Sequence, residues 1–257
     1  METLFIGKNL LFLPEVESTN TYAMGMLRNV NALEGIVVYT DNQTRGKGQR
    51  GSSWNSAVAS NITASIILKP GFLKADESFF LSKISALAIY DVLTDVLNSS
   101  QYDIKIKWPN DMLVNSRKIA GILIENNYHQ QLLQNSVIGI GLNVNQSDFG
   151  DLSSLATSLS RLSGISYDRK AILEKLCSYL EKWYLSLKSG NITQINELYL
   201  ARLNGMNQMA LFRLPGNDEV FEATITGVTK EGHLCLDIPG SGSRTFDIKE
   251  IQFISLQ

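Results

Sequence analysis

The sequence of 257 residues has few of the features that mark secreted or membrane proteins. Its two cysteines are too few for a disulfide framework or a metal site of their own. Cys177 falls in a helical pattern and Cys235 in a strand pattern, so we expect both to pack in apolar surroundings. No apolar run approaches the roughly 20 residues that span a bilayer, and the N-terminal stretch lacks a signal-cleavage pattern. We therefore predict a cytoplasmic protein with no membrane partner.

An excess of positive charge is also missing. The chain has 23 basic and 25 acidic residues, a formal net charge of -2. A protein that binds duplex DNA by neutralising phosphates would be more basic. The first strand is expected almost at the N-terminus, which leaves no room for a helix-turn-helix domain. We therefore expect no DNA partner and no repressor role. Hydrophobic residues make up 44%, which is ordinary for a globular protein with a core.

The apolar spacing predicts an α+β protein in two parts. Helical periodicity is clearest at residues 76–97, 168–188 and 193–203, and Ser18-Thr19-Asn20 is typical of a capped helix start. Strand-like runs occur near residues 1–15, 35–40, 59–70, 104–108, 112–114, 119–124 and 137–144. From Gly205 onward, short alternating segments with glycine turns predict a small β-barrel or meander. We therefore divide the chain into residues 1–204 and 205–257.

A glycine-rich basic loop, QTRGKGQRGSSW, covers residues 43–54. It spells G-x-G-x-x-G, but a dinucleotide loop must open a helix and precede an acidic residue about 20 positions on. Here a Ser- and Asn-rich segment leads into a strand, so that interpretation fails. Two alternatives remain: an anion-binding loop that uses Arg45, Lys47 and Arg50, or a surface hairpin with solvated charges. Trp54 favours the former, because an aromatic face beside cations suits a purine.

A second dense segment runs from Lys107 to Glu125, KWPNDMLVNSRKIAGILIE. Its proline stiffens a turn that delivers Asn110 and Asp111 to one place. The Asp111 carboxylate could hold a divalent metal, and Lys107 could offset phosphate charge. The alternative is an ordinary turn with lysines facing water. Both segments together predict an enzyme with an anionic, nucleotide-containing ligand.

Five motifs in this order resemble those of the biotin protein ligases. They are S-T-N at 18–20, Q-T-x-G-K-G-x-x-G-x-x-W at 43–54, K-W-P-N-D at 107–111, R-K-I-A-G-I-L-I-E at 117–125 and G-x-G-x-N-V-N at 139–145. The resemblance covers nearly the whole chain. It implies a class II synthetase-like catalytic domain, a mixed β-sheet packed with helices, followed by a small C-terminal SH3-like β-barrel.

The resemblance also implies a reaction and its residues. Biotin and Mg-ATP would form biotinyl-5′-AMP, and a lysine of a biotin carboxyl carrier domain would then attack it. The implied biotin positions are Ser18, Thr19, Asn20, Gln43, Gly46, Lys47, Gly48, Lys118 and Gly121. The implied nucleotide positions are Arg50, Trp54, Lys107, Asn110 and Asn143. Lys47, Lys107, Asp111 and Lys118 would serve catalysis, with Asp111 as the Mg²⁺ ligand.

One departure from the family pattern lies in the loop, which in this family is often G-R-G-R-x-G. Lys47 and Gln49 stand at the two arginine positions, so the bidentate guanidinium fork is lost. We hypothesise that Arg45 or Arg50 supplies the missing cation. Two alternative functions stay open: a lipoate or octanoate ligase or transferase on the same scaffold, and a non-catalytic biotin sensor. We expect a monomer or weak homodimer.

Overall fold

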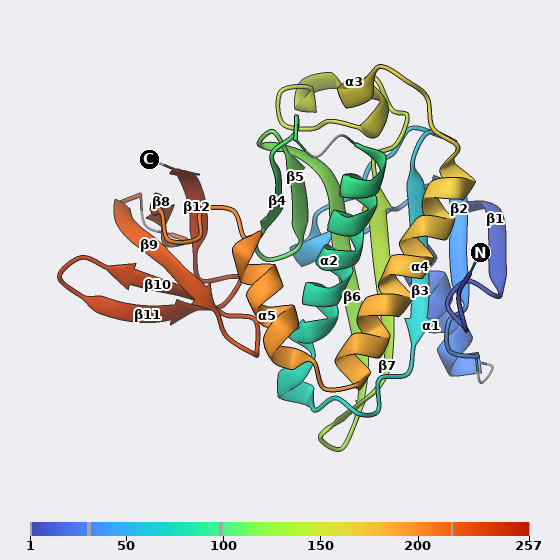
Figure 1. Ribbon diagram of the computed structural model, residues 1–257, viewed down its shortest axis with the longest axis horizontal. Helices are drawn as coiled ribbons and strands as arrows, with labels where there is room; N and C mark the ends of the chain where they lie inside the picture. The colour runs from blue at the N-terminus through green and yellow to red at the C-terminus, as the bar shows by residue number, and fades with distance from the viewer. Residues whose placement is uncertain (1, 30–31, 98–99, 217, 257) are drawn as a thin grey trace.

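A seven-stranded mixed sheet forms the centre of the computed structural model, which describes residues 2–29, 32–97, 100–216 and 218–256 (Figure 1). The strand order is β1-β2-β3-β7-β6-β5-β4. β1 and β2 pair in parallel, and the other neighbours are antiparallel. The strands are β1 (Leu10–Val16), β2 (Val37–Gln43), β3 (Ile62–Leu68), β4 (Ile104–Lys107), β5 (Asp111–Val114), β6 (Arg117–His129) and β7 (Leu132–Leu142).

Helices cover both faces of this sheet. α2 and α4 lie across one face and α1 across the other (Figure 1). β3 is therefore buried at every position, which explains its continuous apolar run. The predicted long helices are confirmed, and none in the described part is long and apolar enough to cross a membrane. The helices are α1 (Thr19–Asn29), α2 (Phe79–Val96), α3 (Leu159–Ser163), α4 (Arg169–Lys188) and α5 (Ile192–Ala201), with 3-10 turns at Gln49–Gly51, Ala75–Glu77 and Gly150–Leu152.

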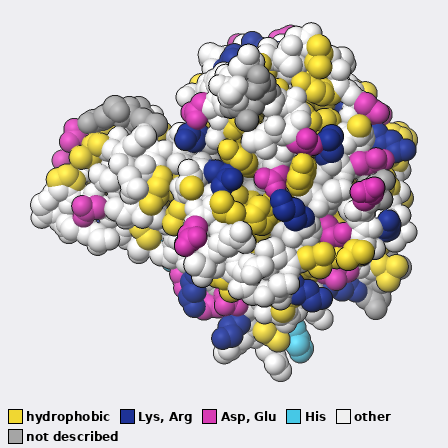
Figure 2. Space-filling view, in the orientation of Figure 1, with side chains coloured by type: hydrophobic (Ala, Val, Ile, Leu, Met, Phe, Trp, Pro, Cys, Tyr) yellow, Lys and Arg dark blue, Asp and Glu magenta, His cyan; other side chains and the backbone are white. Residues whose placement is uncertain are grey.

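Acidic and basic side chains are interspersed on the face that carries α2 and α4 (Figure 2). Some of them join the two helices: Lys175 pairs with Asp95 at 2.6 Å and Lys182 with Asp91 at 3.3 Å. This mixture of charges agrees with the near-zero net charge. Ion pairs at the surface contribute little to the free energy of unfolding.

The C-terminal sheet has five antiparallel strands in the order β11-β10-β9-β8-β12. Burial alternates along β8, as expected for a sheet with one packed face. The predicted meander is confirmed. Within the described residues no pairing joins the edge strands β11 and β12, so the sheet is open and the closed barrel stays a prediction. Its strands are β8 (Met209–Arg213), β9 (Val220–Val228), β10 (Leu234–Ile238), β11 (Gly242–Phe246) and β12 (Gln252–Leu256).

The chain between α5 and β8 covers the outer edge of β4. The Ile106 amide donates to the Arg202 carbonyl at 2.9 Å, and the Asn204 amide donates to the Ile106 carbonyl at 2.8 Å. Beyond them, Trp108 Nε1 donates to the Gly232 carbonyl in the β9–β10 turn at 2.9 Å. The C-terminal sheet is thereby fixed against the end of β4.

Lys83 joins α2 to α5 in a buried aromatic cage. Its ammonium donates to Asn196 Oδ1 at 2.7 Å and lies 5.7, 4.9 and 5.5 Å from the ring centroids of Phe79, Phe80 and Tyr199. Desolvation lowers the pKa of Lys83 to about 8, and the nearby Cys235 and Glu231 side chains partly offset this effect. The cage lies against the β9–β10 turn, because a Cβ on Gly232 would lie 2.4 Å from the Phe79 ring.

Glu181 fastens the N-terminal segment to α4. Its buried carboxylate accepts hydrogen bonds from the backbone amides of Leu4, Phe5 and Ile6, the last two at 2.8 Å. Because Glu181→Ala leaves these amides unpaired, we expect the free energy of unfolding to fall by about 3 kcal/mol. Urea denaturation measures this change. Glu197→Ala, on the exposed side of α5, should change stability by less than about 0.5 kcal/mol. A similar loss in both variants would contradict the role of Glu181.

Candidate active site

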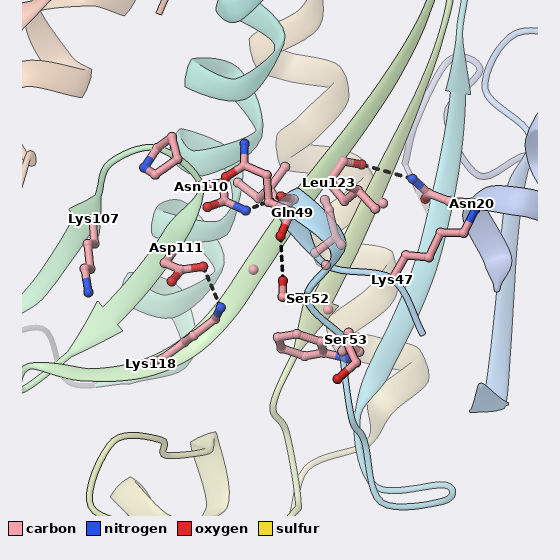
Figure 3. A pocket seen from close by; sticks show the side chains of 18 of the residues that line it. Asn20, Lys47, Gln49, Ser52, Ser53, Lys107, Asn110, Asp111, Lys118 and Leu123 are labelled. Carbon is pink, nitrogen blue, oxygen red and sulfur yellow. Dashed lines mark hydrogen bonds and ion pairs between the residues drawn. The ribbon is translucent and has the colours of Figure 1, made fainter. Parts of the chain in front are cut away.

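A cavity of about 420 Å³ lies between one face of the central sheet and the C-terminal sheet. Its lining comes from the predicted segments 18–20, 43–54, 107–111 and 118–123, from β7 at 139–141, and from 248–253. Figure 3 shows labelled side chains of the first four segments around the cavity, with Lys118 pointing toward Asp111. The structure thus brings together motifs that lie more than 100 residues apart.

One end of the cavity is lined by Thr19, Asn20 and Gln43. They form a polar network with Ser65 and Glu125, in which Thr19, Asn20 and Ser65 are buried. Gln43 Oε1 accepts from the Thr19 amide at 2.8 Å and from Thr19 Oγ1 at 3.1 Å. Ser65 Oγ lies 2.8 Å from Thr19 Oγ1 and 2.6 Å from Asn20 Oδ1. Asn20 Nδ2 donates to Glu125 Oε2 at 2.9 Å. Because each group fixes its neighbour, the network presents preorganised hydrogen-bonding groups.

Sequence reasoning assigned no role to Ser65 and Glu125. Ser65 stands in the apolar run of β3 and is fully buried. A signal was available: Thr63 and Ser65 are polar at alternate positions of an otherwise apolar strand, so they share one face. That face is the one covered by the cavity and α1.

Glycines let other side chains lie flat on the strands beneath the cavity. A Cβ on Gly139 of β7 would lie 2.2 Å from Asn20 Oδ1, and one on Gly141 would lie 2.2 Å from the Trp54 indole. Gly121 pairs with Gly141 across β6 and β7, and a Cβ there would be 3.3 Å from the same indole. This close approach explains why β6 and β7 carry glycine at these positions.

The glycine-rich loop forms a short hairpin at the cavity mouth. Lys47 and Ser53 bridge its two arms, and the Trp54 amide donates to the Gly46 carbonyl at 3.0 Å. Lys47, Gly48 and Gln49 line the cavity. Gly46 does not, and a Cβ there would lie 2.2 Å from the Trp54 carbonyl oxygen and 2.8 Å from Gln43 Nε2.

The structure tests only one of the two arginines that were proposed to replace the missing cation. Arg45 pairs with Glu17 at 3.5 Å, with 79% and 64% of the two side chains exposed, and it does not line the cavity. The side chain of Arg50 lies outside the described residues. Among the loop cations whose side chains the structure describes, Lys47 is the one that lines the cavity.

The opposite end of the cavity is charged. Lys118 Nζ pairs with Asp111 Oδ1 at 2.6 Å (Figure 3) and lies 5.7 Å from the Trp54 ring centroid. Lys107, paired with Asp111 across the β4–β5 turn, also lines the cavity. Among the described lining residues Asp111 is the single acidic one. One carboxylate suits Mg²⁺ that is held mainly by nucleotide phosphates.

Two predicted asparagines act on the backbone around this charged end. Asn110 Nδ2 donates to the Ile122 carbonyl at 2.8 Å and fixes the turn against β6. Asn143 is buried and does not line the cavity; its Nδ2 donates to the Thr157 carbonyl at 3.0 Å. The Thr157 amide in turn donates to the Lys118 carbonyl at 2.9 Å. Asn143 therefore supports the segment that flanks Lys118.

The cavity suits a ligand with a neutral polar head and an anionic tail. No cysteine is among its described lining residues, and burial raises the pKa of the Cys177 thiol to about 12. A reaction here would therefore rely on groups of the bound substrates, with lysines stabilising negative charge.

Comparison with known proteins agrees with this geometry. The model of the biotin/lipoate A/B protein ligase family matches residues 12–143. The bifunctional ligase/repressor BirA of Bacillus subtilis is 32% identical over 241 residues, covering 92% of this chain and 72% of that protein. The chain belongs to the biotin/lipoate A/B protein ligase family. The match to this family runs from β1 to just beyond β7 and so includes every predicted site residue.

Other members of the family resemble the chain over their length. The biotin--[acetyl-CoA-carboxylase] ligase of Mycobacterium tuberculosis is 29% identical over 223 residues, covering 87% of this chain and 81% of that protein. The structure of a biotin protein ligase from Aquifex aeolicus in complex with biotin and ATP has a TM-score of 0.78 at 22% identity, covering 96% and 99%. The last comparison shows the shared fold, including the C-terminal sheet.

Proposed function

We propose that this family member is a biotin protein ligase. It activates biotin with ATP to biotinyl-5′-AMP and pyrophosphate, then transfers biotin to a lysine of the carboxyl carrier domain of acetyl-CoA carboxylase or a related enzyme. The observation that carries the proposal is a single cavity with the buried polar network at one end and Lys118, Asp111 and Lys107 at the other. The names of the relatives support the same substrate.

The polar network would bind the ureido group of biotin. That group offers one carbonyl and two N–H groups, and Gln43, Thr19 and Asn20 supply both donors and acceptors. Ser18 lies beside them in the lining. Gly121, on the strand beneath, lets Trp54 and Lys118 lie close to β6, beside the proposed biotin position. The valeryl carboxylate then points toward Lys118 at the charged end.

Adenylation requires one biotin carboxylate oxygen to attack the α-phosphorus of ATP. A P–O bond forms to biotin as the bond to pyrophosphate breaks. Lys47 and Lys107 would offset the negative charge that builds up on the phosphates. Asp111 would hold Mg²⁺, which supplies further charge neutralisation and phosphate alignment when bound. Trp54 would serve as the platform for adenine, with Asn110, Asn143 and Arg50 as the remaining nucleotide positions.

Transfer requires a neutral lysine amine of the carrier at the acyl carbon. The new C–N bond forms as the C–O bond to AMP breaks, and the amine proton passes to Asp111 or to solvent. Asp111 already binds one lysine, Lys118, at 2.6 Å, so its carboxylate is placed to receive a second ammonium. Residues 205–257 are proposed to form the SH3-like domain of the family.

The polar network favours biotin over lipoate, although the family model covers both ligase types. The dithiolane ring of lipoate has no N–H or carbonyl, so buried network groups would stay unpaired. A site built for hydrogen bonds rejects such analogues by a factor on the order of 10⁴. The two lysines at the charged end favour turnover over a passive biotin sensor.

The test is to incubate the protein with Mg-ATP, an apo carrier domain and either biotin or lipoate, and then to weigh the carrier. We expect a mass gain of one biotin, absent when ATP is omitted, and no gain with lipoate. Equal gains with both acids would overturn the specificity for biotin. Biotin binding without any gain in carrier mass or release of pyrophosphate would identify a sensor instead.

A further inference from the structure

The C-terminal sheet contributes one aromatic ring to the charged end of the cavity. Ile248, Ile251, Gln252 and Phe253 all reach the lining. Phe253 is the one of these four that contacts a cation: Lys107 Nζ lies over its ring, 5.8 Å from the centroid. A cation within about 6 Å of a ring face is attracted to the negative face of that ring.

The ring of Phe253 is fixed by the sheet to which it belongs. It lies 5.6 Å from the fully buried Phe212 ring in a T-shaped contact with an interplanar angle of 83°. Phe253 and Phe212 are also partners in the pairing of β12 with β8, and the register shifts between Phe253 and Ser255. Irregularities of this kind re-aim side chains next to active sites. The position of the ring is therefore set independently of the cavity.

Lys107 depends on this ring for a fixed position. In the described part of the chain no acidic group pairs with its ammonium, and its four-carbon stem is flexible. Its two neighbours, however, are hydrogen-bonded to the C-terminal part of the chain. Ile106 bonds to the segment before β8, and Trp108 bonds to Gly232 at 2.9 Å. The first two residues of the K-W-P-N-D motif and the residue before it thus contact the C-terminal sheet or the chain leading to it.

We propose that Phe253 is a positioning residue that holds the Lys107 ammonium over the cavity, where it meets the phosphates of ATP. The proposal rests on the proposed ligase function and adds to it a role for the C-terminal sheet. Because Phe253 acts through Lys107, its replacement should impair the use of ATP. Biotin binding, at the other end of the cavity, should not depend on it.

The experiment is biotin-dependent exchange of pyrophosphate into ATP by the full chain. Phe253→Leu keeps apolar packing but removes the ring, so kcat/KM for ATP should fall about threefold to thirtyfold, while the KM for biotin stays within twofold. Phe253→Trp should restore exchange, because a tryptophan ring binds cations at least as well. Phe221→Leu is the matched control, since Phe221 contacts Phe212 at 6.1 Å without contacting Lys107.

A double-mutant cycle separates positioning from folding. In a Lys107→Met background, Phe253→Leu should cost nothing further. An equal cost in both backgrounds, or a raised KM for biotin, would overturn the proposal. Thermal denaturation checks folding, and Phe253→Met replaces the leucine variant if that variant fails to fold. No exchange in the wild type would overturn the ligase function and this role with it, whereas wild-type exchange that Phe253→Leu and Phe253→Met leave unchanged would overturn the role alone.

Discussion

A Lys118→Met variant is expected to form biotinyl-5′-AMP about 100- to 1,000-fold more slowly than the wild type. Methionine keeps most of the length of the stem but removes the ammonium, which lies 2.6 Å from Asp111 at the charged end of the cavity. In the proposed function that ammonium meets the biotin carboxylate, so biotin affinity should fall as well. Pyrophosphate exchange measures the rate, and equilibrium dialysis with labelled biotin measures the affinity.

The matched control for this variant is Lys105→Met. Lys105 lies on β4 and forms a partly exposed pair with Asp103 at 3.6 Å, so its loss should change exchange less than twofold. Asp111→Asn, alone and combined with Lys118→Met, adds a further test. If the two groups act as a unit, the loss of exchange in the double variant should differ from the combined losses of the single variants. Normal biotin affinity and normal exchange in Lys118→Met would remove Lys118 from the site.

Local sequence pattern predicted the elements of this fold well. The run of β3 and the periodicity of α2 and α4 are dictated by burial on one or both faces. Asn115 and Ser116, in the turn between β5 and β6, both have positive φ, and asparagine is one of the few residues besides glycine that tolerate this conformation. These features depend on residues that are close in sequence, so they can be predicted from one amino-acid sequence.

The contacts that complete the cavity depend on residues far apart in sequence. Glu125 was visible in its motif, yet its bond to Asn20 requires α1 to be placed across β6. Phe253 lies in a strand with no distinctive motif, and its contact with Lys107 exists because the C-terminal sheet packs on β4. Arg45 shows the reverse: a promising local cation is drawn to Glu17 at the surface. The periodicity of apolar residues does not predict which distant residues will be in contact, whereas family motifs predict some of these contacts.

Gly139→Ala is expected to raise the KM for biotin about 100-fold while the protein stays folded. The added methyl group would lie 2.2 Å from Asn20 Oδ1, far inside van der Waals contact. β7 cannot shift away, since Gly139 is paired with Ser65 of β3 on one side and Leu123 of β6 on the other. Asn20 must therefore move, and it would lose its contacts with Ser65 and Glu125. A displacement of about 1 Å in a positioning group can cost 100-fold.

The measurement is carrier biotinylation at varied biotin concentration, beside urea denaturation. Overpacking should lower the free energy of unfolding by about 1–3 kcal/mol, which leaves a folded enzyme to assay. Gly25→Ala is the matched control: it lies on α1, where an added Cβ meets nothing within 4 Å. It should leave the KM unchanged and stabilise the helix by up to about 1 kcal/mol. If Gly139→Ala loses stability as expected but keeps its KM for biotin, the polar network does not bind the ureido group. The biotin ring would then have to occupy another part of the cavity.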